Sequence, residues 1–229
     1  MRLIFIDTET TSLARPGTEP PGRAIEFCGI PVDVSVNNAK KTSTQNGAPR
    51  WKPAFNVRRD QTVHFKLQLT KKDLAKADKE SLRVNKYHTD TRPFAATTAL
   101  NDKRTRQLWQ NASDIMAGRI VCSQNVAFDI QFIEKELALY GLQDTKRWQR
   151  KHVELWTLSL LTQLTEPSFQ LNKIPPAVKL AWEKNNIISL SAAAGLTDGA
   201  HNGHVAHTTT GDVGMGIELF EYVFTFLNY

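Results

Sequence analysis

Residues 5–11 of the chain read FIDTETT, and they follow directly on Leu3 and Ile4. A short apolar run of this kind predicts a buried strand. The run ends in two acids, Asp7 and Glu9, and side chains two residues apart on a strand share a face. Two ionised carboxylates held together beside a core repel each other, so the pair indicates either a retained proton or a bound cation. The alternative is a solvated strand end with two harmless acids.

The overall composition is that of a globular protein, with 229 residues, 41% of them hydrophobic and 23% charged. This length suffices for a sizeable core, and we expect a single domain over residues 1–229. No apolar run reaches 18 residues and the N-terminus has no secretory pattern, so we expect a cytoplasmic protein without a membrane span. The two cysteines, Cys28 and Cys122, lack metal-type spacing, which predicts reduced, buried thiols.

The charge balance is basic, with a formal net charge of +6. Such an excess of positive charge favours polyanionic partners, of which nucleic acid is one. Part of it lies in residues 37–62, a polar stretch with six Lys or Arg residues and one acid, Asp60. We expect a basic insertion there, forming a hairpin or a long loop. It is either a solvated segment or an electrostatic guide for a nucleic-acid strand.

The periodicity of the chain predicts an α/β fold. The first half is a succession of strand-like segments, whereas strands and helices alternate in the second half, and this suits a mixed sheet covered by helices. Pro31 in the second strand suggests an edge or a bulge. Residues 12–22 form a Pro/Gly-rich connection. We expect strands at 1–7, 23–36, 63–69, 118–125 and at the start of 152–161, and helices within 71–117 and at 127–140, 189–196 and 208–227.

One acid in the helix predicted over 127–140 is out of place. Asp129 lies on the inward stripe that also carries Ile133 and Leu137. Asn125 can cap this helix, which puts Asp129 in or near the first turn, where the helix dipole stabilises a carboxylate. The alternative is a dipole partner at the rim of the core.

The last predicted helix repeats this pattern, with Asp212 shortly after a threonine cap at 208–210. Its apolar stripe follows i, i+4 and i+7 from Val213. Gly214 and Gly216 each cost up to about 1 kcal/mol relative to alanine in a helix, so they suggest close approach of a neighbouring backbone. The alternative is a frayed helix start.

A histidine, His207, stands five residues before Asp212. If it lies on the loop before the helix cap, both side chains can point into one cleft. A zinc site formed with His201 and His204 is a second interpretation, but the glycines and asparagine around them disfavour the helix that would align the three rings.

The unusual residues are thus four carboxylates and one histidine. Carboxylates clustered without cysteine select hard cations such as Mg²⁺ or Mn²⁺. A pair of such ions suits phosphoryl chemistry, because one activates a water and the other stabilises the leaving oxygen. A histidine can accept the proton of that water.

Three stretches together resemble the motifs of the DEDDh 3′→5′ exonucleases, a family that includes the proofreading subunit of bacterial replicative polymerase. They are FIDTETT at 5–11, QNVAFDIQFIEKEL at 124–137 and HTTTGDV at 207–213. Ser12 and Gln124 depart from the usual pattern, but neither stands at a ligand position. The resemblance assigns the family's metal ligands and general base to Asp7, Glu9, Asp129, Asp212 and His207.

The resemblance also implies a fold and a reaction. The fold is ribonuclease H-like, a five-stranded mixed sheet flanked by helices. The reaction is hydrolysis at a 3′ end with two Mg²⁺ or Mn²⁺ ions, releasing nucleoside 5′-monophosphates. Contacts to the terminal nucleotide would come from Thr10, Thr11, Leu13, Asn125 and Phe128.

The expected partner is a DNA 3′ end, single-stranded or frayed. One alternative is the same chemistry on RNA ends or short oligoribonucleotides, because no motif in the chain reads a 2′-hydroxyl. A second is a catalytically silent nucleic-acid-binding module on the same fold, which predicts the loss of a ligand residue. None is missing. The sequence does not indicate a polymerase or another replication partner.

Overall fold

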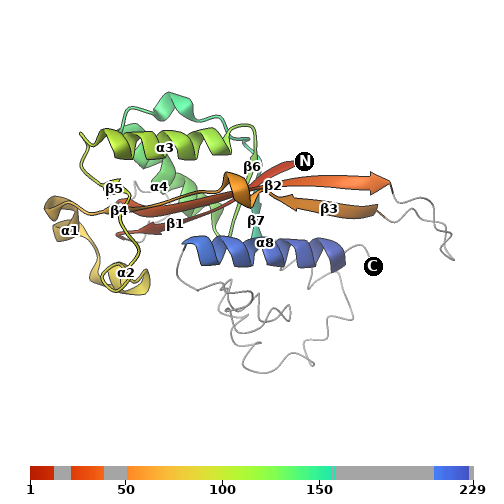
Figure 1. Cartoon of the computed structure of the whole chain (residues 1–229), viewed down its shortest axis with the longest axis horizontal. Coiled ribbons are helices and arrows are strands. Elements are labelled where there is room, and N and C mark those ends of the chain that lie inside the picture. Colours follow the sequence, from red (N-terminus) through yellow and green to blue (C-terminus); the bar gives the residue numbers. More distant parts are fainter. Residues whose placement is uncertain (13–21, 39–50, 156, 158–208, 227–229) are drawn as a thin grey trace, which may run out of the picture.

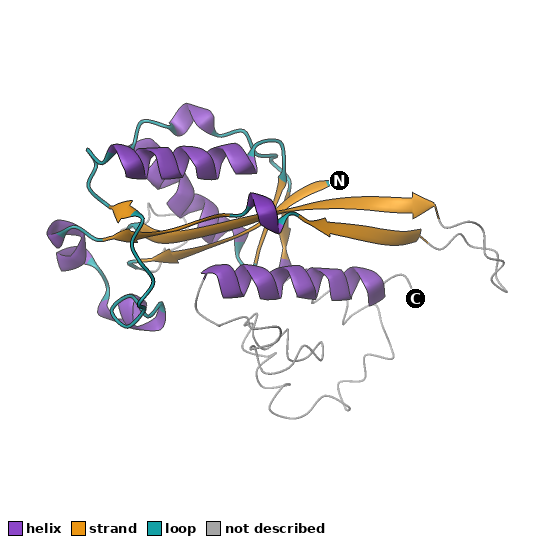
Figure 2. Cartoon of the chain, viewed as in Figure 1, coloured by secondary structure: helices purple, strands orange, loops and turns teal. Residues whose placement is uncertain are grey.

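The computed structural model describes residues 1–12, 22–38, 51–155, 157 and 209–226. They form an α/β fold in which helices cover both faces of one seven-stranded mixed sheet (Figures 1 and 2). Along the sheet the strand order is β5-β4-β2-β1-β6-β7, and β3 pairs with β2 off this path. The strands are β1 (Arg2–Thr10), β2 (Ala24–Asn38), β3 (Trp51–Val57), β4 (Val63–Gln68), β5 (Ala96–Thr97), β6 (Ile120–Ser123) and β7 (His152–Glu154).

β1 is a central strand of this sheet. It pairs antiparallel with β2 and parallel with β6. All four residues from Leu3 to Ile6 are apolar and at most 2% exposed, as a strand covered on both faces requires. Leu3 and Phe5 pack in one core cluster, while Ile4 and Ile6 pack in the other.

The helices divide between the two faces. Figure 1 shows α3 and α4 on one side of the sheet and α8 on the other, with α1 and α2 at one end. α4 begins where the sequence predicted, because the Asn125 side chain accepts a hydrogen bond from the Phe128 amide at 3.3 Å. The bounds are α1 (Lys71–Lys76), α2 (Lys79–Val84), α3 (Lys103–Met116), α4 (Val126–Leu139) and α8 (Thr209–Phe226), with 3-10 turns η1 (Arg59–Gln61) and η2 (Gln143–Thr145).

Aromatic side chains fill both interfaces between sheet and helices. Towards α3 and α4, the Trp109 ring lies 5.0 Å from Phe65 and 6.1 Å from Phe27, centroid to centroid. Towards α8, the Phe220 ring lies 5.3 Å from Phe5. Burying one such side chain contributes about 1.5–3 kcal/mol. The apolar stripe predicted from Val213 thus faces the sheet and fixes α8 against β1.

The sheet is larger than the five strands expected from the resemblance. The extra strands are β3, which pairs antiparallel with the far half of β2, and the two-residue β5, which pairs parallel with β4. The ends of the basic stretch 37–62 therefore lie in the last residues of β2, in β3 and in η1. Figure 1 shows β2 and β3 projecting beyond the helices. The helix expected at 189–196 lies outside the described residues.

Pro31 does not mark an edge, because β2 has neighbours on both sides. β4 pairs with β2 over Glu26–Gly29, and β3 pairs with it over Val32–Asn38. The Pro31 carbonyl accepts a hydrogen bond from the Arg58 amide at 2.9 Å on the side of these two strands. In an antiparallel strand the nitrogen of a residue points the same way as its carbonyl. The position of Pro31 that lacks an N–H therefore lies between the residues of β2 that pair with β4 and those that pair with β3.

Two further expectations concern the thiols and the membrane. Cys28 and Cys122 are both buried and free, as predicted, and burial raises the pKa of each thiol. Among the described residues, no helix is both long enough and apolar enough to cross a membrane.

Candidate metal centre

The alternation of β1 carries its two acids onto the face covered by α8. Leu3 and Phe5 of β1 lie in the same core cluster as residues of α8, and Asp7 and Glu9 continue that face beyond the cluster. Both acids are partly buried. The end of β1 therefore presents two carboxylates beside the start of α8.

α8 supplies the third acid. Asp212 lies in its first turn, as the sequence predicted, and is also partly buried. One carboxylate oxygen from each of Asp7, Glu9 and Asp212 lies within 4.8 Å of the other two. Segments about two hundred positions apart in the chain thus meet in one group, which we call the acid cluster. Gly216, one turn further along α8, lines a small cavity together with Asp7 and Asp212.

Asp129 lies beside the acid cluster but is not one of its three members. It is 3% exposed at the start of α4, on the other face of the sheet. Its Oδ1 accepts hydrogen bonds from the Thr8 amide at 3.0 Å and the Thr8 hydroxyl at 2.7 Å, and its Oδ2 accepts one from the Ser123 hydroxyl. These bonds fix its orientation. Its charge nevertheless reaches the cluster, since it is the largest like-charge contribution to the raised pKa of Asp7.

The acid cluster is strained electrostatically. Burial, followed by repulsion from neighbouring carboxylates, raises the pKa of Asp7 well above its usual range. Burial and the charges of Asp212 and Glu26 raise the pKa of Glu9 to about 8, although Arg92 opposes this. Burial also raises the pKa of Asp129 to about 6, despite the hydrogen bonds from Ser123 and Thr8. Glu9 therefore retains its proton near neutrality unless a cation compensates its charge.

A fifth acid, Glu26, was missed by the sequence reasoning. It pairs with Glu9 across β1 and β2 and is 2% exposed. Its carboxylate binds the Arg92 guanidinium at 2.9 Å, the His64 ring at 2.9 Å and the Thr209 hydroxyl at 2.7 Å. Burial alone would raise its pKa, but these hydrogen bonds and the charge of Arg92 lower it.

Glu26 therefore links the start of α8 to the sheet. The bond from Thr209 ties the first residue of α8 to β2, three residues before Asp212. The sequence contained a signal for Glu26. Residues two apart on a strand share a face, so Glu26 lies on the same face of β2 as Cys28 and Ile30, whose side chains pack in the core.

The residues expected to contact substrate are mostly engaged in local structure. The Thr10 hydroxyl donates to the Ser12 carbonyl at 2.8 Å, and the Thr11 hydroxyl accepts from the Arg23 amide at 2.8 Å. Asn125 is exposed at the cap of α4, and the half-buried ring of Phe128 packs against Phe132 with centroids 5.0 Å apart. Leu13 and His207 lie outside the described residues, as do His201 and His204 of the zinc interpretation.

A search of protein-family models and of curated proteins finds no match to the chain. The resemblance to the DEDDh exonucleases therefore rests on its motif residues.

Proposed function

We propose that the chain is a metal-dependent 3′→5′ exonuclease that releases nucleoside 5′-monophosphates from DNA. The observation that carries this proposal is the acid cluster. Three carboxylates from the first strand and the last helix have ligand atoms within 4.8 Å of one another, with Asp129 beside them. These are the four acids that the resemblance assigns to metal binding.

The donor set of the acid cluster fits Mg²⁺ or Mn²⁺. Both ions prefer carboxylate oxygens, and the cluster holds no thiolate that would favour zinc. Oxygens bound to one Mg²⁺ at 2.0–2.1 Å lie at most about 4.2 Å apart. The spacing of the ligand atoms in the acid cluster is therefore close to that around one shared ion. A bound cation would also relieve the repulsion that contributes to the raised pKa values of Asp7 and Glu9.

The arrangement of the sheet also supports the proposal. Strands β4, β2 and β1 are successively antiparallel, and β1, β6 and β7 are successively parallel. These five strands make a mixed sheet of the kind that a ribonuclease H-like fold implies, and β3 and β5 are additions to it. The acids lie at the end of its central strand and at the start of helices on its two faces.

In this proposal each residue has a separate role. Asp7, Glu9 and Asp212 would hold the ions, and Asp129 beside them would complete the ligand set. When bound, the ions activate a water and stabilise the leaving oxygen. His207 accepts the proton of that water. Glu26 is a positioning residue, because it fixes the start of α8 through Thr209.

The test is a digestion series with DNA and RNA single strands labelled at either end, with Mg²⁺, with Mn²⁺ or with EDTA. We expect a 5′ label to remain on a shortening ladder, and a 3′ label to appear at once as a mononucleotide. EDTA should stop both reactions. The Asp212→Asn variant should be inactive and the Asp114→Asn variant, altered at an exposed acid of α3, fully active. Undiminished hydrolysis in EDTA would overturn the proposal, and preference for RNA would redirect it to oligoribonucleotides.

A further inference from the structure

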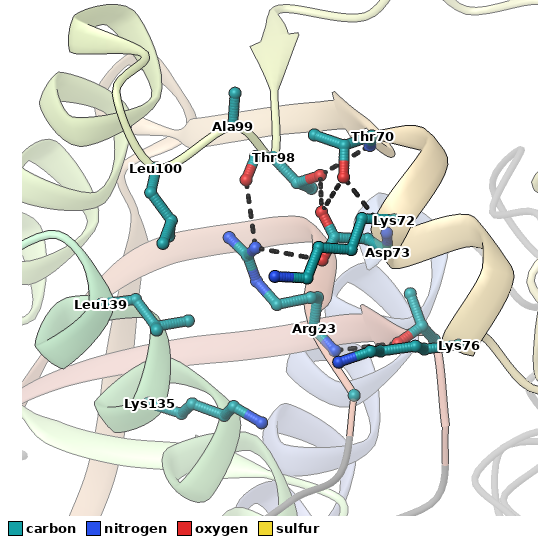
Figure 3. A pocket seen from close by; sticks show the side chains of 12 residues that line it. Arg23, Thr70, Lys72, Asp73, Lys76, Thr98, Ala99, Leu100, Lys135 and Leu139 are labelled. Atoms are coloured by element: carbon teal, nitrogen blue, oxygen red, sulfur yellow. Dashed lines mark hydrogen bonds and ion pairs between the residues drawn. The ribbon is translucent and has the colours of Figure 1, made fainter.

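A second hollow lies beyond the end of β1, between α1, α4 and the segment after β5. Its volume is about 450 Å³, within the range of small-molecule sites, about 300–1,000 Å³. Figure 3 shows the amino ends of Lys72 and Lys76 from α1 and of Lys135 from α4 directed toward this hollow. Leu100 and Leu139 form its apolar wall. We call it the basic pocket.

Positive charge dominates the basic pocket. Among the described residues that line it, four are cations, the three lysines and Arg23, and one is a carboxylate, Asp73. Arg23 is neutralised within the fold, because its Nε and Nη2 donate to Glu136 at 2.7 and 2.8 Å. Asp73 is held by hydrogen bonds from the Thr70 and Thr98 hydroxyls. The lining therefore attracts an anion.

The apolar wall distinguishes this pocket from a plain basic patch. Leu100 is 58% exposed and Leu139 is 38% exposed. Both belong to the few large hydrophobic side chains that are exposed to solvent among the described residues. They come from different segments, yet both line the same hollow. A ligand with a flat apolar part would cover them.

We propose that the basic pocket binds a nucleotide, with its phosphate on Lys72, Lys76 and Lys135 and its base against Leu100 and Leu139. A nucleotide joins an anionic group to a flat ring whose two faces are apolar. The lysines act as charged donors to phosphate oxygens. Helices present most of the site, since Lys72 and Lys76 lie on α1 and Lys135 and Leu139 on α4, while Leu100 lies in the turn before α3.

The basic pocket is separate from the acid cluster. No residue of the acid cluster lines it, and the cluster repels phosphate when no metal is bound. Nucleotide binding in the basic pocket therefore does not depend on the proposed hydrolysis. The nucleotide could come from two sources, a free nucleoside monophosphate or one unit of a nucleic-acid strand, and both offer the same phosphate and base.

The first experiment measures calorimetric binding of adenosine 5′-monophosphate to the full chain in EDTA. We expect the double variant Lys72→Ala, Lys76→Ala to weaken binding at least tenfold. It removes two ammonium groups that donate charge-assisted hydrogen bonds to the phosphate oxygens. The matched control is Lys71→Ala with Lys79→Ala, two exposed lysines on α1 and α2 that do not line the pocket. Both pairs change exposed side chains, and we expect both variants to fold.

A second pair of variants tests the apolar wall. Leu100→Ser should weaken binding of the nucleotide several-fold but leave binding of inorganic phosphate unchanged. Leu74→Ser is its control, since Leu74 is 40% exposed on α1 and does not line the pocket. Absence of nucleotide binding, or equal weakening by the test and control pairs, would overturn the proposal.

Competition distinguishes the two sources. A short single strand that displaces the bound monophosphate, and does so less well in the Lys72→Ala, Lys76→Ala variant, identifies a strand unit as a ligand. A strand that binds without displacing it leaves the free monophosphate as the ligand. An Asp212→Asn variant should keep nucleotide binding in either case, so failure of the hydrolysis proposal would not be mistaken for failure of this one.

Discussion

Glu136 and the acid cluster are both carboxylate sites in the interior of the protein, but their neighbours carry opposite charges. Glu136 on α4 is 0% exposed and receives Arg23 through Nε and Nη2, as well as the Ala24 amide at 3.1 Å. Burial raises the pKa of Glu136, but Arg23 and the Ala24 amide oppose that rise, so the partners of this carboxylate come from the fold itself. In the acid cluster burial raises the pKa of both Asp7 and Glu9, and the neighbouring carboxylates raise it further instead of opposing it.

The difference separates a structural carboxylate from a functional one. A buried charge with a fixed partner stabilises one arrangement of the chain and needs nothing from outside. Several carboxylates held against one another are tolerated only when a proton or a cation reduces the repulsion. Glu136 and the acid cluster should therefore respond differently to mutation, to metal and to pH.

The largest expected effect is on hydrolysis. Replacing Asp7, Glu9, Asp129 or Asp212 by alanine should each lower kcat about a thousandfold or more, because ions that they hold contribute several kcal/mol to the transition state. Single-turnover digestion of a labelled strand measures this loss. The folded fraction, checked by circular dichroism, should stay high. A variant of any of the four that keeps full activity would remove that residue from the ligand set.

The second effect concerns the base. His207→Ala should lower kcat by about 10²–10⁴-fold, the usual contribution of a general base, and should leave metal binding intact. Because His207 lies outside the described residues, this prediction rests on its five-residue spacing to Asp212. His204→Ala is the matched control. A damaging His204→Ala beside a harmless His207→Ala would show that the third motif has been placed in the wrong register.

The third effect is a lower free energy of unfolding, without a loss of hydrolysis by the folded protein. Glu136→Ala leaves the buried Arg23 guanidinium without its main partner, which typically costs about 3–5 kcal/mol. Urea unfolding in EDTA measures it. Glu134 lies on the same helix as Glu136, and Glu134→Ala breaks a solvent-accessible ion pair with Lys146, which should cost about 1 kcal/mol or less. Equal losses in the two variants would contradict the structural role given to Glu136.

The smallest effect is a pH dependence of the metal-free protein. The pKa of Glu9 is raised in the fold from 4.5 to about 8, so its contribution favours the fold at low pH and is lost as pH rises through this interval. Glu9→Gln should remove that loss and stabilise the metal-free protein at the upper end by about 1 kcal/mol or more, since one pKa unit corresponds to 1.36 kcal/mol. Parallel urea midpoints of wild type and variant across this range would contradict it.

The positions of Asp129 and Asp212 were predictable because local rules suffice. Asn125 marks the start of α4, so the spacing to Asp129 already places that acid in the first turn, on the buried stripe. The stripe from Val213 likewise orients α8. Alternation along β1 then puts Asp7 and Glu9 on one face. None of these steps needs a long-range contact.

Glu26 and the basic pocket depend on tertiary structure. Glu26 is a single acid in an apolar strand, and its importance appears only when Arg92, His64 and Thr209 converge on it from distant segments. Leu100 and Lys72 belong to segments without a recognisable motif, and only the fold brings them to one hollow. β5 has two residues, too few for a periodic pattern, so the sequence does not predict this strand.

The most direct test of the acid cluster as a cation site is the number of protons released when Mn²⁺ binds at neutral pH, measured by calorimetry in buffers of different ionisation enthalpy. Carboxyl groups with raised pKa values must lose their protons before they bind a metal. We expect wild type to bind Mn²⁺ with net proton release, Glu9→Gln to release fewer protons, and Glu136→Gln to match the wild type. Mn²⁺ binding without proton release, or no difference between wild type and Glu9→Gln, would contradict the assignment.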